Sequence, residues 1–396
     1  MRKISEIENA IDSLSSALRL NPNDFSARAH RAEAFNILGR IDEAIIDYRE
    51  ALRIKPDDES LLRKISICLV NSNRGREAIE LCQKALEIQP SMLSAKLGIA
   101  WVHSTMVPTW HLPMMNEVER NTAYYMGLKA AITADKLVLE IGTGSGLLSM
   151  MAARLGAQRV VACEAESLIA ETAQKIVEQN NYQNIVKVLP KTSFAVEPGK
   201  DLPEKADILI HELFSSELLG ENVLPTIEDA KNRLLKPAAK IIPAAASIMI
   251  ALVGGEAIGK YVHVDDAFGF HLAEFNKISP RKIPFYREDL NPVLLSDAIE
   301  AFHFDFSGNS QYPGETKILA IAAKQEGLCY GVIQWIRLQI DETTRFENHP
   351  LANKSVSNWQ HTVFRFEKPI YLQPESVVNV QASHDRSFPW FELLPA

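Results

Sequence analysis

A repeat of 34 residues is the feature of this sequence that most constrains how the chain can fold. Three similar blocks are in register: Ala17–Pro22 (ALRLNP), Ala51–Pro56 (ALRIKP) and Ala85–Pro90 (ALEIQP). Each block ends an apolar helical pattern at a proline, which cannot continue an α-helix. Ala44 and Ala78 keep the same spacing at the start of the second helix of each pair. The sequence therefore predicts stacked helix pairs that bury their apolar faces against one another.

This period and its proline-ended blocks resemble the tetratricopeptide repeat. We place the repeat domain at residues 1–107, with a capping helix over Ser94–Met106 before Pro108. The resemblance implies a concave surface that recruits a peptide or a protein. The alternative is a helical cap that only covers the domain that follows.

The rest of the chain changes pattern twice. From Leu137 to Leu235, short apolar runs alternate with amphipathic helical stretches, which is typical of a parallel sheet in an α/β, Rossmann-like domain. After Pro243 the helical signal fades, and runs such as Ala245–Val253 and Val332–Ile340 read as antiparallel strands. We therefore expect a multidomain protein, with an α/β domain at 108–242 and a β-barrel-like domain at 243–396.

Composition excludes several classes of protein. The 396 residues exceed what one core usually supports, and the net charge of −8 makes nucleic acid an unlikely partner. The four cysteines form no CxxC pair, so we expect neither a disulfide framework nor a metal site. The sequence predicts no membrane span and no secretory signal, because its apolar runs are too short and its N-terminus is charged. We expect a cytoplasmic protein.

A glycine-rich loop follows the first strand of the α/β domain. Gly142, Gly144 and Gly146 are spaced GxGxG, whereas the dinucleotide fingerprint GxGxxG would need a glycine in place of Leu147. A GxGxG loop preceded by an acid, here Glu140, is typical of enzymes that bind S-adenosylmethionine (AdoMet). Glu164 closes the next strand, where a carboxylate can accept both ribose hydroxyls. The spacing disfavours an oxidoreductase and predicts AdoMet as the cofactor.

Three segments resemble the protein arginine methyltransferases: Trp110–Tyr124 (WHLPMMNEVERNTAY), Val138–Met150 (VLEIGTGSGLLSM) and His211–Glu221 (HELFSSELLGE). The resemblance covers the chain from about Pro108 to its end. With the repeats in front, the sequence is most similar to the branch that carries tetratricopeptide repeats, and the monomethylating branch is a near second.

This resemblance assigns roles position by position. Arg120 matches the arginine that grips the AdoMet carboxylate, and Met114 matches the methionine beside the transferred methyl group. Glu212 and Glu221 match the two catalytic ends of the double-glutamate loop. The remaining matches are cofactor-binding residues (His111, Glu140, Gly142, Gly144, Gly146 and Glu164) and substrate-binding residues (Glu117 and Trp359).

The chemistry of the residues supports these roles. A guanidinium is planar, charged and rich in N–H donors, so two carboxylates nine residues apart on one loop can hold it from both sides. Between them, Glu217 is expected to be structural. The family's Thr-His-Trp loop falls at 357–359, where Asn358 replaces the histidine, so a proton relay from histidine to a carboxylate is doubtful.

The sequence thus predicts an AdoMet-dependent protein arginine N-methyltransferase whose repeats recruit an arginine-containing protein or peptide. One alternative is an inactive scaffold with a retained AdoMet-binding module. Another is a methyltransferase that acts on a small molecule or a modified peptide. We also expect a homodimer with an arm at about 268–295, while monomethyl, symmetric and asymmetric products stay open.

Overall fold

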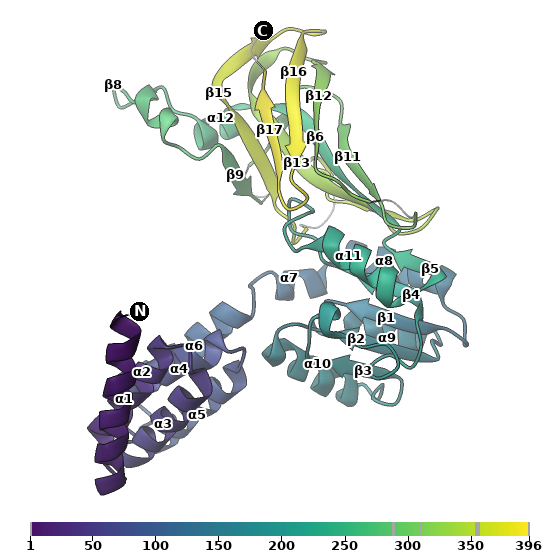
Figure 1. Ribbon diagram of the computed structural model, residues 1–396. Coiled ribbons are helices and arrows are strands. Elements are labelled where there is room, and N and C mark those ends of the chain that lie inside the picture. The colour runs from purple at the N-terminus through teal and green to yellow at the C-terminus, as the bar shows by residue number, and fades with distance from the viewer. Residues whose placement is uncertain (1, 287–289, 309–310, 353–356, 395–396) are drawn as a thin grey trace. The chain divides into compact units, whose positions relative to one another are not determined.

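The computed structural model describes residues 2–286, 290–308, 311–352 and 357–394 (Figure 1). The chain forms two compact units. One consists of Met1–His111 with Glu166–Thr172, and the other of Leu112–Ala165 with Ala173–Ala396. The predicted repeats lie in the first unit, and both sheet-bearing parts lie in the second. No helix in the described ranges is long and apolar enough to cross a membrane.

The first unit is a run of consecutive helices, each packed against the next. They are α1 (Arg2–Leu20), α2 (Phe25–Ile37), α3 (Ile41–Ile54), α4 (Glu59–Asn71), α5 (Gly75–Ile88) and α6 (Leu93–Met106). Ala44 and Ala78, the two alanines spaced 34 apart, are completely buried at the helix crossings. Small residues there let the helices approach closely, which explains why the repeat keeps alanine.

The 34-residue period extends to the helix ends. The Asp24 side chain accepts a hydrogen bond from the Ala27 N–H at the start of α2, and Asp58 does the same for Leu61 at the start of α4. The turns after these two helices contain Gly39 and an asparagine, both with a left-handed backbone that those residue types tolerate. The predicted tetratricopeptide fold is confirmed.

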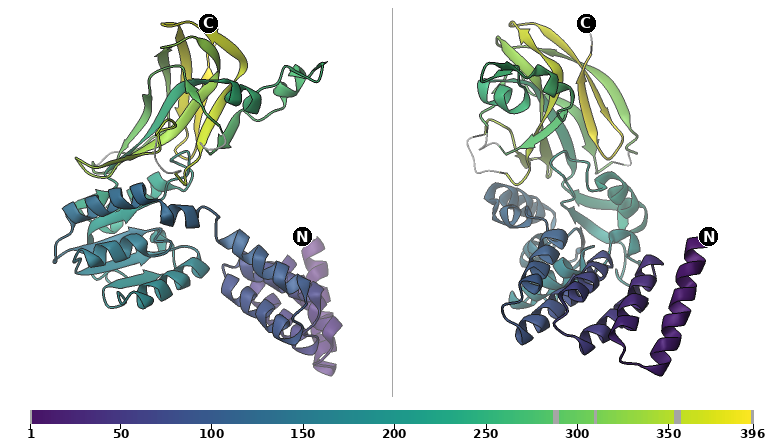
Figure 2. Two further views of the ribbon diagram at one scale, coloured as in Figure 1. Left: turned by 180° about the vertical axis from the view of Figure 1, so that it is seen from behind. Right: turned by 90° about the vertical axis from the view of Figure 1, so that its left-hand side faces the viewer.

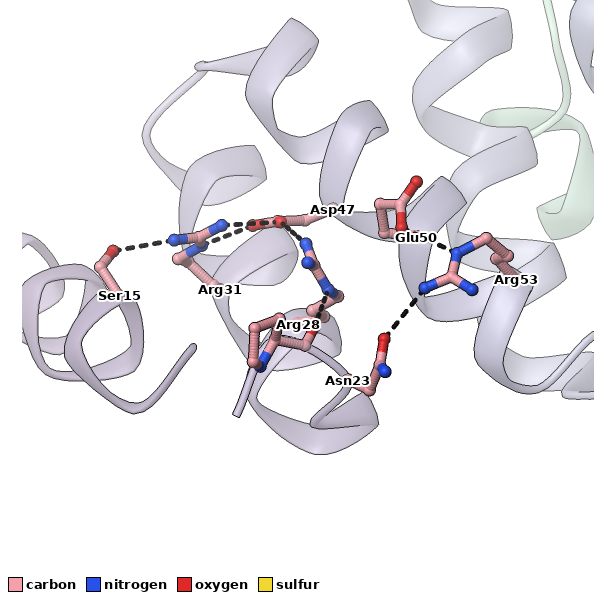
Figure 3. Close-up of polar contacts among 8 residues, drawn as sticks. Ser15, Asn23, Arg28, Arg31, Asp47, Glu50 and Arg53 are labelled. Carbon is pink, nitrogen blue, oxygen red and sulfur yellow. Dashed lines mark hydrogen bonds and ion pairs between the residues drawn. The ribbon is translucent and has the colours of Figure 1, made fainter. Parts of the chain in front are cut away.

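A buried carboxylate ties the first three helices together (Figure 3). Asp47 on α3 is 1% exposed and accepts two hydrogen bonds from Arg31 on α2, at 2.6 and 2.8 Å. Arg31 also donates to Ser15 on α1, and Arg28 donates to Asp47 at 3.2 Å. The charge of Asp47 is thus paired and hydrogen-bonded, as a buried charge must be.

The second unit begins with α7 (His111–Asn116, whose first residue is grouped with the other unit) and α8 (Val118–Ala131), followed by a parallel sheet. Its strand order is β3-β2-β1-β4-β5, and all neighbouring strands run parallel. The strands are β1 (Leu137–Ile141), β2 (Arg159–Cys163), β3 (Val186–Leu189), β4 (Ala206–His211) and β5 (Leu235–Ile242). The connecting helices are α9 (Leu147–Arg154), α10 (Ser167–Gln179), the short η1 (Ser193–Ala195) and α11 (Val223–Arg233).

Two antiparallel sheets follow, which Figure 2 shows from two further sides. The larger has the order β10-β6-β13-β15-β9, with β11 paired to β6 and β14 to β13, and the smaller has the order β12-β16-β17. The strands are β6 (Ala245–Gly254), β9 (Lys282–Phe285), β10 (Val293–Leu294), β11 (Ile299–Asp305), β12 (Glu315–Ala322), β13 (Gly327–Gln339), β14 (Arg345–Glu347), β15 (His361–Leu372), β16 (Val377–His384) and β17 (Pro389–Leu393). Central strand β6 is buried along its whole length. The predicted succession of helical repeats, α/β domain and antiparallel β domain is confirmed.

The segment expected to be an arm projects from the β domain (Figure 2, left). The projecting segment runs from α12 (Glu256–Val262) through the strand pair β7 (Asp266–Ala267) and β8 (Phe270–His271) to η2 (Ala273–Lys277), so it contains the first part of the arm expected at about 268–295, whereas β9 and β10 of that range belong to the larger sheet. Phe268 is fully exposed, and Phe270, Phe275 and Ile278 are mostly exposed. Residues 287–289 of the expected arm lie outside the described residues.

Candidate active site

The parallel sheet brings three predicted site segments to one edge. Strand β1 lies between β2 and β4, and its last residue, Ile141, pairs with Cys163 of β2 and His211 of β4. The residues that follow, Gly142, Glu164 and Glu212, therefore leave the sheet side by side. The carboxyl edge of a parallel sheet, near the strands where the chain order reverses, is where such folds bind ligands.

The glycine loop has a backbone that only glycine adopts readily. Gly142, Gly144 and Gly146 all have positive φ, at 75°, 54° and 82°. A Cβ added to Gly142 would also lie 2.7 Å from the side chain of Leu213. Gly146 caps the start of α9, so the loop ends at a helix N-terminus with unpaired N–H groups.

Glu140 lies beneath this loop. Its carboxyl group is buried and accepts hydrogen bonds from Thr143 Oγ1 at 2.6 Å and from the Ser149 hydroxyl. Burial raises the pKa of Glu140 to about 7, although both hydroxyls favour the charged form. Glu140 thus ties the loop to the first turns of α9. Its prediction as a cofactor-binding residue stays a prediction, since the observed contacts shape the loop.

Glu164 approaches the loop from β2. Its Oε2 atom accepts a hydrogen bond from the Gly144 N–H at 3.0 Å. The carboxylate is therefore placed beside the glycine loop, at the position predicted for binding ribose.

Arg120 on α8 reaches the end of β4. It is 2% exposed, and its Nη2 atom lies 3.2 Å from Oε2 of Glu212. The guanidinium lies over the ring of Tyr124, whose hydroxyl donates to the carbonyl oxygen of His211 at 3.0 Å. Arg120 Nε is buried and has no hydrogen-bond partner among the residues described. A buried arginine with a free donor indicates that the site is built to accept an anionic group.

The two loop glutamates, Glu212 and Glu221, interact electrostatically. Burial raises the pKa of Glu212 to about 7; the charge of Arg120 opposes this, and repulsion from Glu221 and Glu117 adds to it. Burial, which removes water from the carboxyl group, and repulsion from Glu164 raise the pKa of Glu221. Glu212 thus interacts with Arg120, Glu117 and Glu221, and Glu221 interacts with Glu164, so a further cation beside these carboxylates would relieve their repulsion.

The β domain closes the other side of this cluster. The Asn358 N–H donates to Oε2 of Glu117 at 3.2 Å, and Trp359 Nε1 donates to the carbonyl oxygen of Phe214 at 2.7 Å. Burial raises the pKa of Glu117. Oδ1 of Asn358 is buried without a hydrogen-bond partner in the described part of the chain. The structure thus brings Glu117 and Trp359 to the loop that carries Glu212.

Two predicted residues lie on α7. The carbonyl oxygen of Met114, which is buried, accepts a hydrogen bond from the Glu117 N–H at 3.2 Å. This backbone contact lies within the turn between α7 and α8, and the predicted position of Met114 beside the methyl group stays a prediction. The ring of His111 contacts the ring of Trp110 in a tilted arrangement, with ring centroids 4.0 Å apart, and burial lowers the pKa of His111. Its predicted role in cofactor binding stays a prediction.

Sequence reasoning missed several residues of this region. Thr143 and Ser149 hold Glu140, and Tyr124 supports Arg120. All three residues lie within the segments that resemble the family, and this position is the signal that could have identified them. Lys282 pairs with Glu217 at 2.7 Å, and no motif marked that lysine.

A GxGxG loop after the first strand of a parallel sheet and an acid after the second are typical of the AdoMet-dependent methyltransferase fold. Residues 125–243 match the family model described as "Ribosomal protein L11 methyltransferase (PrmA)", and residues 2–59 match "Tetratricopeptide repeat".

Similar proteins identify the family of methyltransferases to which the chain belongs. An "Arginine N(omega)-methyltransferase" of Streptomyces achromogenes subsp. streptozoticus is 33% identical over 293 residues, covering 74% of this chain and 80% of that enzyme. "Protein arginine N-methyltransferase 9" of Mus musculus is 27% identical over 391 residues, covering 89% of this chain and 46% of that protein. This chain belongs to the arginine N-methyltransferase family, and it spans about half the length of the mouse relative.

A solved structure shares the fold. The "Trypanosoma brucei PRMT1 enzyme-prozyme heterotetrameric complex with AdoHcy" superimposes with a TM-score of 0.60 at 20% identity, covering 70% of this chain and 90% of that chain. AdoMet is the methyl donor of the family. The site fits this cofactor, because Arg120 offers a buried free donor for a carboxylate and the glycine loop leaves its backbone open to a ligand.

Proposed function

We propose that this protein transfers a methyl group from AdoMet to a guanidinium nitrogen of an arginine in a protein or peptide, and that Glu212 and Glu221 hold that guanidinium. The observation that supports the proposal is a series of carboxylates that repel one another: Glu212, which pairs with Arg120 at 3.2 Å, interacts with Glu117 and Glu221, and Glu221 interacts with Glu164. Such a cluster is destabilised by its own repulsion, and a bound guanidinium relieves it.

The cofactor side of the site is assigned as follows. Arg120 binds the AdoMet carboxylate through its fork of N–H groups, which a lysine could not match. In doing so it gives up part of its pairing with Glu212, which becomes free to bind the acceptor. Glu164 binds the ribose hydroxyls, the loop Gly142–Gly146 lies against the cofactor, and Met114 borders the methyl group. His111 and Glu140 complete this side.

The acceptor side has to orient one nitrogen. When bound, AdoMet supplies a methyl group on a positively charged sulfur. Glu212 and Glu221 accept hydrogen bonds from the guanidinium, drawing its positive charge toward themselves and aligning the attacking nitrogen for the methyl group. A carboxylate of this pair accepts the proton that this nitrogen loses when it is methylated. Glu117, which precedes α8, and Trp359 of the β domain line the entrance for the arginine. The β domain is barrel-like in the family that the sequence resembles.

Charge supports a basic substrate. Residues 1–107 contain equal numbers of acidic and basic residues, so the net charge of −8 resides in residues 108–396. An acidic catalytic part attracts arginine-rich segments. The repeats would then recruit the substrate protein through a separate surface.

Assembly and location complete the proposal. Phe268 and Phe270 expose a large apolar area at the tip of the arm, and exposed apolar patches of this kind mark interaction sites. We assign the arm to a homodimer, and we place the protein in the cytoplasm.

A second acceptor class is supported by one observation. The Streptomyces relative, of which this chain covers 80%, is named for arginine and not for protein arginine. A small guanidinium compound is therefore the competing acceptor. The test compares an arginine-containing peptide with free L-arginine, at equal concentration, with labelled AdoMet. The protein-substrate proposal expects a higher kcat/KM for the peptide, and a higher value for free arginine would overturn it.

A further inference from the structure

The first half of the double-glutamate loop is fixed by the β domain. Trp359 Nε1 donates to the carbonyl oxygen of Phe214, and Gln334 Nε2 donates to that of Ser216 at 3.2 Å. The Gln360 N–H donates to Ser216 Oγ at 2.9 Å. These three contacts end on Phe214 and Ser216, close behind Glu212. They hold Glu212 without reaching the far end of the loop.

The second half has a different anchor. Lys282 Nζ donates to Oε2 of Glu217 at 2.7 Å, and the two side chains are 33% and 15% exposed. Among the described residues, this is the only hydrogen bond or ion pair that joins residues 217–221 to a residue outside the loop. The next residue, Leu218, is buried with φ of 74°, a conformation that costs energy for leucine and persists only when the surroundings impose it.

Lys282 is itself held firmly. It is the first residue of β9 and pairs with Phe364 of β15. Just before it, the Arg365 side chain donates to the carbonyl oxygens of Pro280 and Ser279 at 2.8 and 3.0 Å. The lysine therefore comes from a strand that is paired within the β domain, which suits it to fix a loop.

Glu217 is a third carboxylate on the same loop. It lies in sequence between Glu212 and Glu221, whose like charges oppose each other. An ammonium group on Glu217 neutralises this additional charge and ties it to β9. The loop can then keep its two terminal carboxylates at the separation that a guanidinium bridges.

We propose that Lys282 is a positioning residue for the acceptor arginine, which acts through Glu217 on the loop that carries Glu212 and Glu221. This inference rests on the proposed function, because it assumes that the loop binds the acceptor. It assigns Glu217 to loop geometry and leaves the guanidinium to the other two glutamates.

The first experiment replaces Lys282 by the uncharged Met. We expect the KM for an arginine peptide to rise about tenfold, as for loss of one charge-assisted hydrogen bond, while the Kd of AdoMet stays within twofold. Lys282→Arg should restore most of the loss, because it keeps the charge. Lys200→Met is the matched control: it removes an exposed Lys–Glu pair at 2.8 Å elsewhere in the second unit, and it should change neither constant.

The second experiment is a double-mutant cycle. Glu217→Gln should raise the same KM, and the Lys282→Met/Glu217→Gln pair should be no worse than either single change. The exchanged pair Lys282→Glu/Glu217→Lys should recover part of the wild-type KM. Additive losses, or a fall in AdoMet affinity that parallels the rise in KM, would overturn the inference in favour of a general structural role.

The two proposals fail in different ways. A wild-type protein that methylates no arginine acceptor overturns the proposed function and this inference together. An active wild type whose Lys282→Met variant keeps the wild-type KM overturns the inference alone.

Discussion

Glu212→Gln should raise the stability of the protein and lower its activity. The substitution keeps the size of the side chain and removes its charge. The carboxyl group of Glu212 is 7% exposed, and burial raises its pKa from 4.5 to about 7 against the opposing effect of Arg120. The folded protein therefore prefers the neutral form of this group, which glutamine imitates.

The size of the stability effect follows from this pKa. Because the folded-state value lies above the unfolded-state value, the native state holds one more proton between about pH 4.5 and 7. Wild-type stability consequently falls as pH rises through that window and stays lower above it. A change from 4.5 to about 7 corresponds to about 3 kcal/mol at 1.36 kcal/mol per pH unit. Glu212→Gln should gain up to that amount at pH 8 and much less at pH 5, which lies only just above the unfolded-state pKa of 4.5.

Activity should change the other way. Removal of one charged hydrogen-bond acceptor from the guanidinium costs about 1.5 to 3 kcal/mol, or roughly a ten- to hundredfold loss of kcat/KM. Glu221→Gln should lose a similar amount, and Glu217→Gln should be milder. AdoMet affinity should change little in all three variants.

The assays are urea unfolding at pH 5 and pH 8, and methyl transfer to an arginine peptide. Glu197→Gln, an exposed change in the same domain, is the control that should alter neither. A Glu212→Gln protein that is less stable than the wild type at pH 8, or that methylates at the wild-type rate, would refute this reasoning.

Three further predictions follow from the same structure. The kcat/KM for the acceptor should rise between about pH 6 and 8, as Glu212 ionises, and Glu212→Gln should flatten that profile; a steep profile in the variant would assign the titration to another group. Deletion of Met1–Val107 should reduce activity on a folded protein more than on a short peptide, because the repeats raise the effective substrate concentration; equal losses would favour a covering role. Light scattering should give a dimer mass for the wild type and a monomer for Phe268→Ser/Phe270→Ser, and an active wild-type monomer would remove the proposed dimer.

Local patterns in the sequence predicted the repeats and the cofactor loop well. The prolines every 34 residues mark where helices must end, and the observed turns repeat with the same period. The GxGxG spacing reflects a backbone with three positive φ angles, a requirement that the residue type itself reveals. Such signals are readable because cause and consequence lie within a few residues of each other.

Contacts between distant segments could not be read in this way. The ion pair between Arg120 and Glu212 joins α8 to the end of β4, and Glu117 meets Asn358 across 241 positions of sequence. Strand β5 also escaped prediction, because its exposed middle and its proline lack the apolar run of a buried strand. It is an edge strand, where such residues are tolerated.

The site residues were predicted from the resemblance to the family, and the fold explains why they lie close together. Gly142, Glu164 and Glu212 are far apart along the chain but follow three adjacent parallel strands. Glu140 shows what motif reasoning leaves out. Its place before the glycine loop predicts a cofactor contact, which stays a prediction, but the motif did not indicate that Thr143 and Ser149 donate to its Oε2 atom.

The central claim is that the acceptor is an arginine guanidinium, and its most direct test is to identify the methylated group. The full chain is incubated with labelled AdoMet and an arginine-containing protein substrate, the product is hydrolysed to amino acids, and the labelled amino acid is identified by mass spectrometry. The account predicts label in methylarginine, abolished or strongly reduced when Glu212 and Glu221 are both replaced by Gln. Label in any other amino acid, or methylarginine formed equally well by that double variant, would contradict it.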